Sequence, residues 1–162
     1  MFGKKKDQDS KKNTPSLPPE GGQASLSKRK ILVVDDDLVI VKALTLKLEA
    51  SGYTVVSAND GATAVSLVRH EHPDLVILDV NFPPEVGMSW DGFKITEWFR
   101  TRAGAGGVPV IIITGDDSAR NQERAASVGA VAFFQKPVNT EELLTTIREV
   151  LAESGGSEPA QA

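Results

Sequence analysis

The stretch that decides the fold is D-L-V-I-L-D-V, residues 74–80. Its apolar run, rich in β-branched residues, leads directly into Asp79 and predicts a strand buried on both faces. An unpaired buried carboxylate is costly, so we expect Asp79 to mark the point where the strand leaves the core. In open parallel sheets this edge binds ligands. The simpler interpretation is that Asp79 only ends the strand or caps the next helix.

Similar apolar runs alternate with amphipathic segments along the rest of the chain. We predict strands at 30–34, 53–58, 74–80, 108–114 and 130–135, and helices at 38–51, 61–69, 93–102, 116–128 and after the capping box Asn139-x-x-Glu142. Alternation of this kind gives a parallel sheet with helices on both faces and right-handed crossovers. The predicted fold class is therefore α/β, a doubly wound, flavodoxin-like five-stranded sheet in the order 2-1-3-4-5.

Composition places the chain in a broad class. Its 162 residues, 40% of them hydrophobic, suffice for one domain with tails. The absence of cysteine excludes disulfides and thiolate chemistry and fits a reducing compartment. No apolar run is long enough to span a membrane, and no apolar stretch follows the basic N-terminus as in a secretory signal. We therefore expect a cytoplasmic protein.

Charge divides the chain unevenly. Residues 1–30 carry a net charge of +5 and the rest carries −9, which together give −4. We expect 1–27 to be a disordered basic tail, 28–153 a single domain, and 154–162 a short disordered tail. The acidic body argues against a nucleic acid partner, whereas the basic tail leaves nucleic acid and membrane-surface contact open.

Polar residues gather where the predicted strands end. Asp35 and Asp36 follow the first strand, Asp79 the third, Thr114 the fourth and Lys136 the fifth. Strand order 2-1-3-4-5 brings these ends to one edge, where three carboxylates would repel one another. Lys136 and a hard divalent cation, Mg²⁺ or Mn²⁺, would balance them. These are the groups needed to hold a phosphoryl group and to stabilise its transfer.

The sequence resembles the receiver domain of two-component response regulators, in particular the small, CheY-like chemotaxis type. The resemblance covers about residues 29–153, and its motifs are V-V-D-D at 33–36, L-V-I-L-D-V-N at 75–81, D-G at 91–92, I-I-T-G at 112–115 and F-F-Q-K-P at 133–137.

The resemblance implies a phosphoryl acceptor and a metal site. Asp79 would be the nucleophile that takes a phosphoryl group from a phosphohistidine. Asp36 would bind Mg²⁺ directly and Asp35 through water, together with Asp79 and the backbone carbonyl of Asn81. Asp37, the third aspartate of its run, is favoured as the cap of the following helix over a metal ligand.

The resemblance also implies the residues that respond to phosphorylation. Thr114 would hydrogen-bond the phosphoryl oxygen, and Lys136 would pair with Asp79 and then with the phosphoryl group. Phe133 occupies the position of the family's switch aromatic. Pro137 lies where the family has a cis peptide bond. The face built from the fourth helix, the fifth strand and the fifth helix is the expected output surface.

One segment departs from the family pattern. Twelve positions separate Asp79 from Asp91, more than the family has, and the extra residues lie within 82–90. This loop either influences partner choice and the access of water to the acyl phosphate, or is a tolerated surface insertion. Asp116, two residues after Thr114, also bears on the hydrolysis rate.

The function indicated is a stand-alone response regulator, a signalling switch and not an enzyme beyond its own phosphotransfer and dephosphorylation. The expected partners are a sensor histidine kinase or phosphotransfer protein, which would donate the phosphoryl group, and a downstream target protein. A weak homodimer is a further expected form. The nine residues after 153 cannot fold into a DNA-binding domain. Alternatives are a phosphorelay carrier, a scaffold localised by its basic tail, and a Mg²⁺-dependent aspartyl phosphatase. Asn81 argues against the phosphatase, since that class usually has an aspartate there as general acid.

Overall fold

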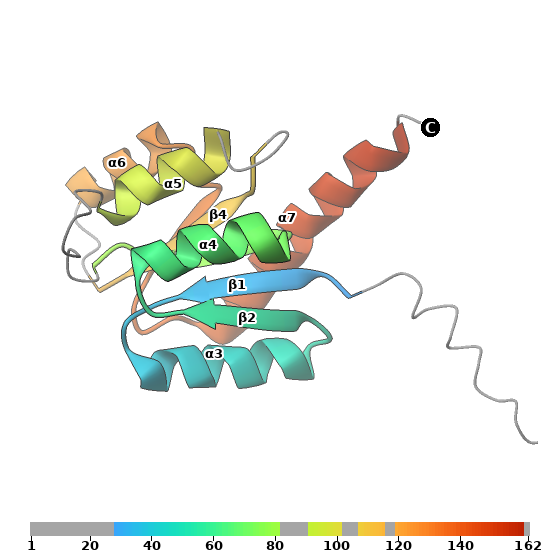
Figure 1. Cartoon of the computed structure of the whole chain (residues 1–162), viewed down its shortest axis with the longest axis horizontal. Helices are drawn as coiled ribbons and strands as arrows, with labels where there is room; N and C mark the ends of the chain where they lie inside the picture. The colour runs from blue at the N-terminus through green and yellow to red at the C-terminus, as the bar shows by residue number, and fades with distance from the viewer. Residues whose placement is uncertain (1–27, 82–90, 102–106, 116–118, 161–162) are drawn as a thin grey trace, which may run out of the picture.

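The computed structural model describes residues 28–81, 91–101, 107–115 and 119–160 (Figure 1). The strands within these ranges are β1 (Lys30–Val34), β2 (Thr54–Ala58), β3 (Leu75–Asp79), β4 (Val110–Thr114) and β5 (Ala132–Gln135). The helices are α3 (Leu38–Ala50), α4 (Gly61–Glu71), α5 (Gly92–Thr101), α6 (Ala119–Ser127) and α7 (Thr140–Ala160). Among these helices none has the length and apolar content that a bilayer span requires.

The sheet has the predicted topology. All neighbouring strands are parallel, and their order is β2-β1-β3-β4-β5. Val34 lies opposite Leu78, and Asp79 lies opposite Ile113. The register therefore brings the carboxyl ends of β1, β3 and β4 to one edge, and the residues that follow them lie side by side.

Alternate residues of the central strands face two separate hydrophobic cores. Leu75 and Ile77 pack with side chains of α3 and α7, whereas Val76 and Leu78 pack with side chains of α4, α5 and α6. Every residue of β3 is buried, as predicted for a strand covered on both faces. Asp79 was expected where the strand leaves the core, but it is buried as well, because Lys136 pairs with its carboxylate. The helices consequently form two layers with the sheet between them (Figure 1).

Four helices begin at a polar residue that caps them. The carboxylate of Asp37 accepts a hydrogen bond from the backbone N–H of Val39, so its predicted role as a cap is confirmed. Asp60, Asp91 and Asn139 cap α4, α5 and α7 in the same way. These side chains satisfy backbone N–H groups that have no partner within their own helix.

Some element boundaries differ from the predicted ones. β4 begins at Val110, because Pro109 has no N–H to donate to a neighbouring strand. α7 continues to Ala160, seven residues past the expected end of the domain at 153. The basic tail 1–27, the loop 82–90 and Asp116 lie outside the described residues.

Candidate functional site

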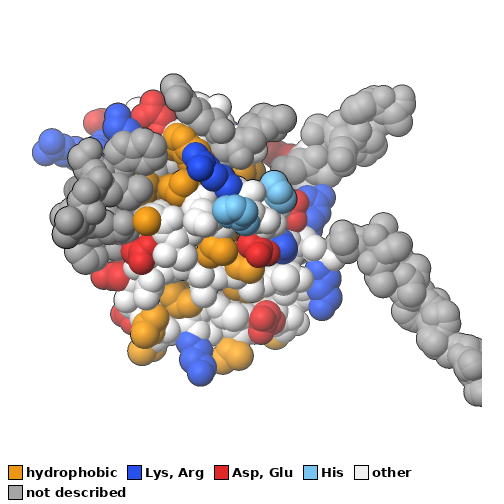
Figure 2. Space-filling model, in the orientation of Figure 1, with side chains coloured by type: hydrophobic (Ala, Val, Ile, Leu, Met, Phe, Trp, Pro, Cys, Tyr) orange, Lys and Arg blue, Asp and Glu red, His pale blue; other side chains and the backbone are white. Residues whose placement is uncertain are grey.

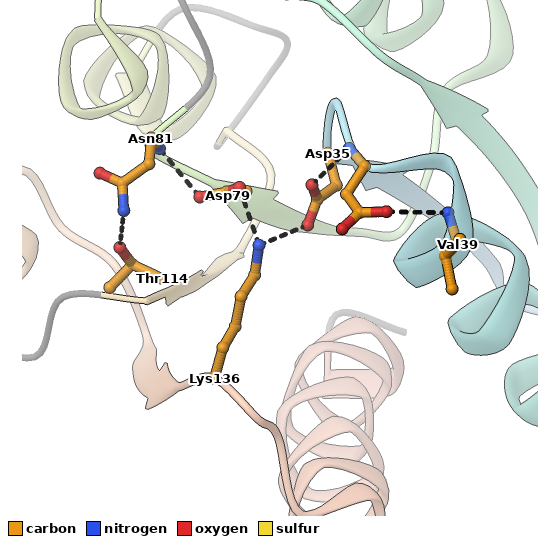
Figure 3. A network of polar contacts seen from close by, with 7 residues as sticks. Asp35, Val39, Asp79, Asn81, Thr114 and Lys136 are labelled. Atoms are coloured by element: carbon orange, nitrogen blue, oxygen red, sulfur yellow. Dashed lines mark hydrogen bonds and ion pairs between the residues drawn. The ribbon is translucent and has the colours of Figure 1, made fainter.

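Two buried carboxylates and one ammonium group form the centre of the site (Figure 3). Asp35, just after β1, is fully buried, and Asp79 at the end of β3 is 3% exposed. Lys136, just after β5, places its Nζ 2.8 Å from Oδ2 of Asp35 and 2.9 Å from Oδ2 of Asp79. The charges that the sequence analysis predicted to meet at this edge are therefore in direct contact.

Backbone N–H groups hold the other oxygen of each carboxylate. Oδ1 of Asp35 accepts a hydrogen bond from the backbone N–H of Asp37 at 2.9 Å. Oδ1 of Asp79 accepts one from the backbone N–H of Asn81 at 2.8 Å. Because both oxygens of each group are engaged, the two carboxylates have fixed orientations in a site with little solvent.

The pKa values of Asp35 and Lys136 are both raised, for different reasons. Desolvation raises the pKa of Asp35, and the nearby charge of Asp79 adds to this, although hydrogen bonds from Lys136 and Asp37 act against it. Burial alone would lower the pKa of Lys136, but its bonds to Asp35 and Asp79 outweigh burial and raise it. Lys136 therefore remains charged at neutral pH, while the charged form of Asp35 is disfavoured.

The third carboxylate completes a set suited to a hard cation. Asp36 is exposed next to Asp35, and ligand atoms of Asp35, Asp36 and Asp79 all lie within 4.8 Å of one another. Within the described ranges these three aspartates are the cluster of acidic side chains whose ligand atoms lie close enough together to bind one metal ion. An all-oxygen donor set fits Mg²⁺ or Mn²⁺, and the exposed side of Asp36 leaves room for water ligands.

Thr114 lies beside Asp79 at the end of β4. It is fully buried, and its hydroxyl oxygen accepts a hydrogen bond from the side-chain amide of Asn81 (Figure 3). From the sequence only the backbone carbonyl of Asn81 was expected to take part, and this side-chain contact was not predicted. The available signal was that Asn81 lies two residues after Asp79, just past the end of the strand next to the one that ends in Thr114.

The remaining predicted residues also lie near this edge. The Lys136–Pro137 peptide bond is cis, as predicted. Phe133 of β5 is half-buried and packs against the core formed with α4 and α5. It is therefore neither fully exposed nor fully enclosed, and its ring lies on the strand that leads to Lys136.

The D-G motif at 91–92 has a packing role that the sequence analysis did not identify. A Cβ atom on Gly92 would lie 2.5 Å from Cα of Val80, closer than any side chain permits. Glycine therefore allows the start of α5 to lie directly against the residue after Asp79. Asp91 caps α5 and also forms an ion pair with Arg124 of α6, with Nη2–Oδ2 at 2.9 Å.

Comparison with known proteins identifies the family. The sequence model of the response regulator receiver domain matches residues 31–148. The chain belongs to the response regulator receiver domain family, in agreement with the resemblance drawn from its motifs.

Individual relatives support this identification. Protein PilH of Pseudomonas aeruginosa is 37% identical over 123 residues, which cover 76% of this chain and 98% of PilH. The probable transcriptional regulator ycf27 of Porphyridium aerugineum is 35% identical over 126 residues, 78% of this chain but only 49% of that protein. A CheY-like receiver domain protein from Methanospirillum hungatei has a similar structure, with a TM-score of 0.71 and 30% identity over 81% of this chain and 99% of that one.

Proposed function

We propose that this protein is a phosphorylation-controlled signalling switch in which Asp79 accepts a phosphoryl group from a phosphohistidine. The observation that carries the proposal is the ammonium group of Lys136, which bridges Asp79 and Asp35 beside Thr114. Such a group can stabilise negative charge as it develops on a transferring phosphoryl group. Family membership supports the same role.

The transfer step uses the groups in place at the sheet edge. A carboxylate oxygen of Asp79 attacks phosphorus, the phosphorus–nitrogen bond of the donor breaks, and its electron pair returns to the imidazole nitrogen. Lys136 exchanges part of its contact with Asp79 for a phosphoryl oxygen. Asp35, Asp36, Asp79 and the carbonyl of Asn81 would hold Mg²⁺, which when bound offsets the charge of the phosphoryl oxygens.

The switch follows from the position of Thr114. In the structure its hydroxyl oxygen accepts a hydrogen bond from Asn81. We expect Thr114 to turn toward the phosphoryl oxygen after transfer and Phe133 to move further into the core. Phosphorylation would thus favour a second conformation of α6, β5 and α7, which we assign as the output face.

The donor protein needs a surface next to Asp79, and the start of α3 provides one. Leu38 is 66% exposed and Val39 is 76% exposed, immediately after the acidic run at 35–37. Figure 2 shows hydrophobic side chains over α3 at the lower edge of the view. Exposed apolar side chains beside a reactive edge are suited to contact with a sensor kinase or phosphotransfer protein.

Labelling with a small phosphodonor in the presence of Mg²⁺ tests this function. We expect the wild-type protein to form an acid-stable, alkali-labile acyl phosphate, and Asp79→Asn to lose it. Asp60→Asn is a matched control, because it removes a carboxylate from a helix cap where asparagine serves equally well. Labelling of Asp79→Asn at the wild-type rate would exclude Asp79 as the acceptor.

A phosphorelay carrier is the second candidate, and it uses the same chemistry. Incubating phosphorylated protein with a histidine phosphotransfer domain separates the two, since a carrier returns its label to histidine and a terminal switch keeps it. A phosphatase role is not supported, because the amide of Asn81 donates to Thr114 and cannot act as a general acid.

A further inference from the structure

Helix α6 has little anchorage in the hydrophobic core. Ala125 is its one buried residue among Ala119–Ser127, whereas α5 on the same face of the sheet buries five residues. Alanine contributes little apolar area, so core packing fixes the position of α6 only weakly. Contacts made by its surface side chains therefore carry more weight than they would on a deeply packed helix.

Arg124 makes two such contacts, both with the start of α5. Its Nη2 lies 2.9 Å from Oδ2 of Asp91, and the guanidinium carbon lies 4.1 Å from the ring centroid of Phe93. The planar guanidinium group can pair with a carboxylate and cover an aromatic ring at the same time, which a lysine cannot do equally well. The pKa of Asp91 is lowered, because bonds from the Lys94 N–H and from Arg124 outweigh its partial burial.

The start of α5 is in turn fixed to the strand that carries the acceptor. Asp91 caps α5 through the backbone N–H of Lys94, and Gly92 packs against Val80, the residue after Asp79. A continuous set of contacts therefore runs from Asp79 through Val80, the start of α5 and Arg124 to α6. This set does not include Thr114, whereas Phe133 packs against the same hydrophobic core as Val80 and Phe93.

We propose that Asp91, Phe93 and Arg124 form a latch that holds α6 in its resting position and couples that position to the state of Asp79. The latch rests on the proposed function, because it regulates the same phosphorylation switch. It stabilises the resting conformation, so opening it raises the fraction of molecules in the conformation that phosphorylation favours. Apparent affinity and reaction rate both scale with that fraction.

Two measurements on one set of variants test the latch. The first is the initial rate of phosphorylation by acetyl phosphate with Mg²⁺, and the second is the apparent dissociation constant for beryllofluoride, followed by tryptophan fluorescence. For Arg124→Ala we expect the rate to rise about two- to fivefold and the dissociation constant to fall by the same factor, in keeping with one exposed ion pair and one cation–π contact.

A double-mutant cycle isolates the contact. Asp91→Asn keeps a capping side chain but removes the charge, and we expect it to resemble Arg124→Ala. The double variant should show no larger effect than Arg124→Ala alone, because Asp91→Asn removes only the ion pair that Arg124→Ala has already removed. Arg120→Ala is the control, since it removes the same charge from the same helix, and we expect it to behave as the wild type.

Three results would overturn the latch while leaving the phosphorylation switch intact. They are wild-type rates in Arg124→Ala, additive effects in the double variant, or an equal acceleration in Arg120→Ala. Failure of the wild-type protein to be labelled at Asp79 would instead reject the proposed function itself. Thermal unfolding of each variant checks that the helix layer remains folded.

Discussion

At the scale of single residues, the buried carboxylate of Asp35 lowers the stability of the fold. It is fully buried, and among the described residues its charge has one cationic partner, Lys136, which it shares with Asp79. Two carboxylates on one ammonium leave net negative charge in a poorly solvated place. A metal ion would relieve this imbalance, so the cluster is arranged for binding more than for the stability of the metal-free protein.

We expect Asp35→Asn to be more stable than the wild-type protein at pH 7 without metal, by about 1 kcal/mol. The pKa of Asp35 is higher in the folded protein than its value of 3.8 in the unfolded chain. The protonated carboxyl therefore stabilises the folded protein below pH 3.8, and this contribution is lost as the pH rises through the pKa of the folded state. Asparagine resembles the protonated form at every pH. Urea denaturation in EDTA at several pH values should therefore show a gain that shrinks toward acid pH, and lower stability at pH 7 would contradict this account.

Gly92 offers a second residue-scale prediction. A Cβ atom there meets the backbone of Val80 at 2.5 Å, so Gly92→Ala must displace α5 or β3 and should cost about 1–3 kcal/mol. Gly115→Ala is the control, because a Cβ at that position has nothing within 4 Å. Chemical denaturation of both variants measures the difference. Equal stability for the two would show that the start of α5 is free to move.

At the scale of elements, the helices differ in how firmly they are held. α6 buries Ala125 alone, whereas α7 buries Leu143, Leu144, Ile147 and Leu151. We therefore expect the backbone amides of α6 to exchange with solvent faster than those of α5 or α7 in the unphosphorylated protein. Hydrogen exchange followed by mass spectrometry tests this, and protection of α6 equal to that of α5 would refute it.

The elements also show which features could be predicted from the sequence. Apolar runs that end in polar residues define parallel strands whose ends must share an edge, so Asp35, Asp79 and Lys136 could be brought together without coordinates. The contact of Asn81 with Thr114 and the ion pair of Asp91 with Arg124 could not. Both depend on side-chain rotamers and on the spacing of neighbouring elements, which hydrophobic periodicity does not encode.

At the scale of the whole molecule, metal binding should be visible as added stability. We expect Mg²⁺ at ten times its dissociation constant to stabilise the folded protein by about 1.4 kcal/mol, because the unfolded chain has no preformed site. The increase in melting temperature on adding Mg²⁺ should be largely lost in Asp36→Asn. The carboxylate removed by this change is exposed and lies beside the buried carboxylates of Asp35 and Asp79. An unchanged response in that variant would remove Asp36 from the ligand set.

The long sequence separation across the site has a further consequence. Asp35 and Lys136 are 101 residues apart, and Asp79 and Lys136 are 57 apart, yet each pair is in direct contact. Contacts between distant parts of a chain carry a larger loop-closure entropy cost than local contacts, so they form more slowly. During synthesis Asp35 and Asp79 leave the ribosome well before Lys136, whose ammonium group pairs with both carboxylates. In the proposed function the site is complete only when the fifth strand has joined the sheet, so an unfinished copy of the chain could not take up a phosphoryl group.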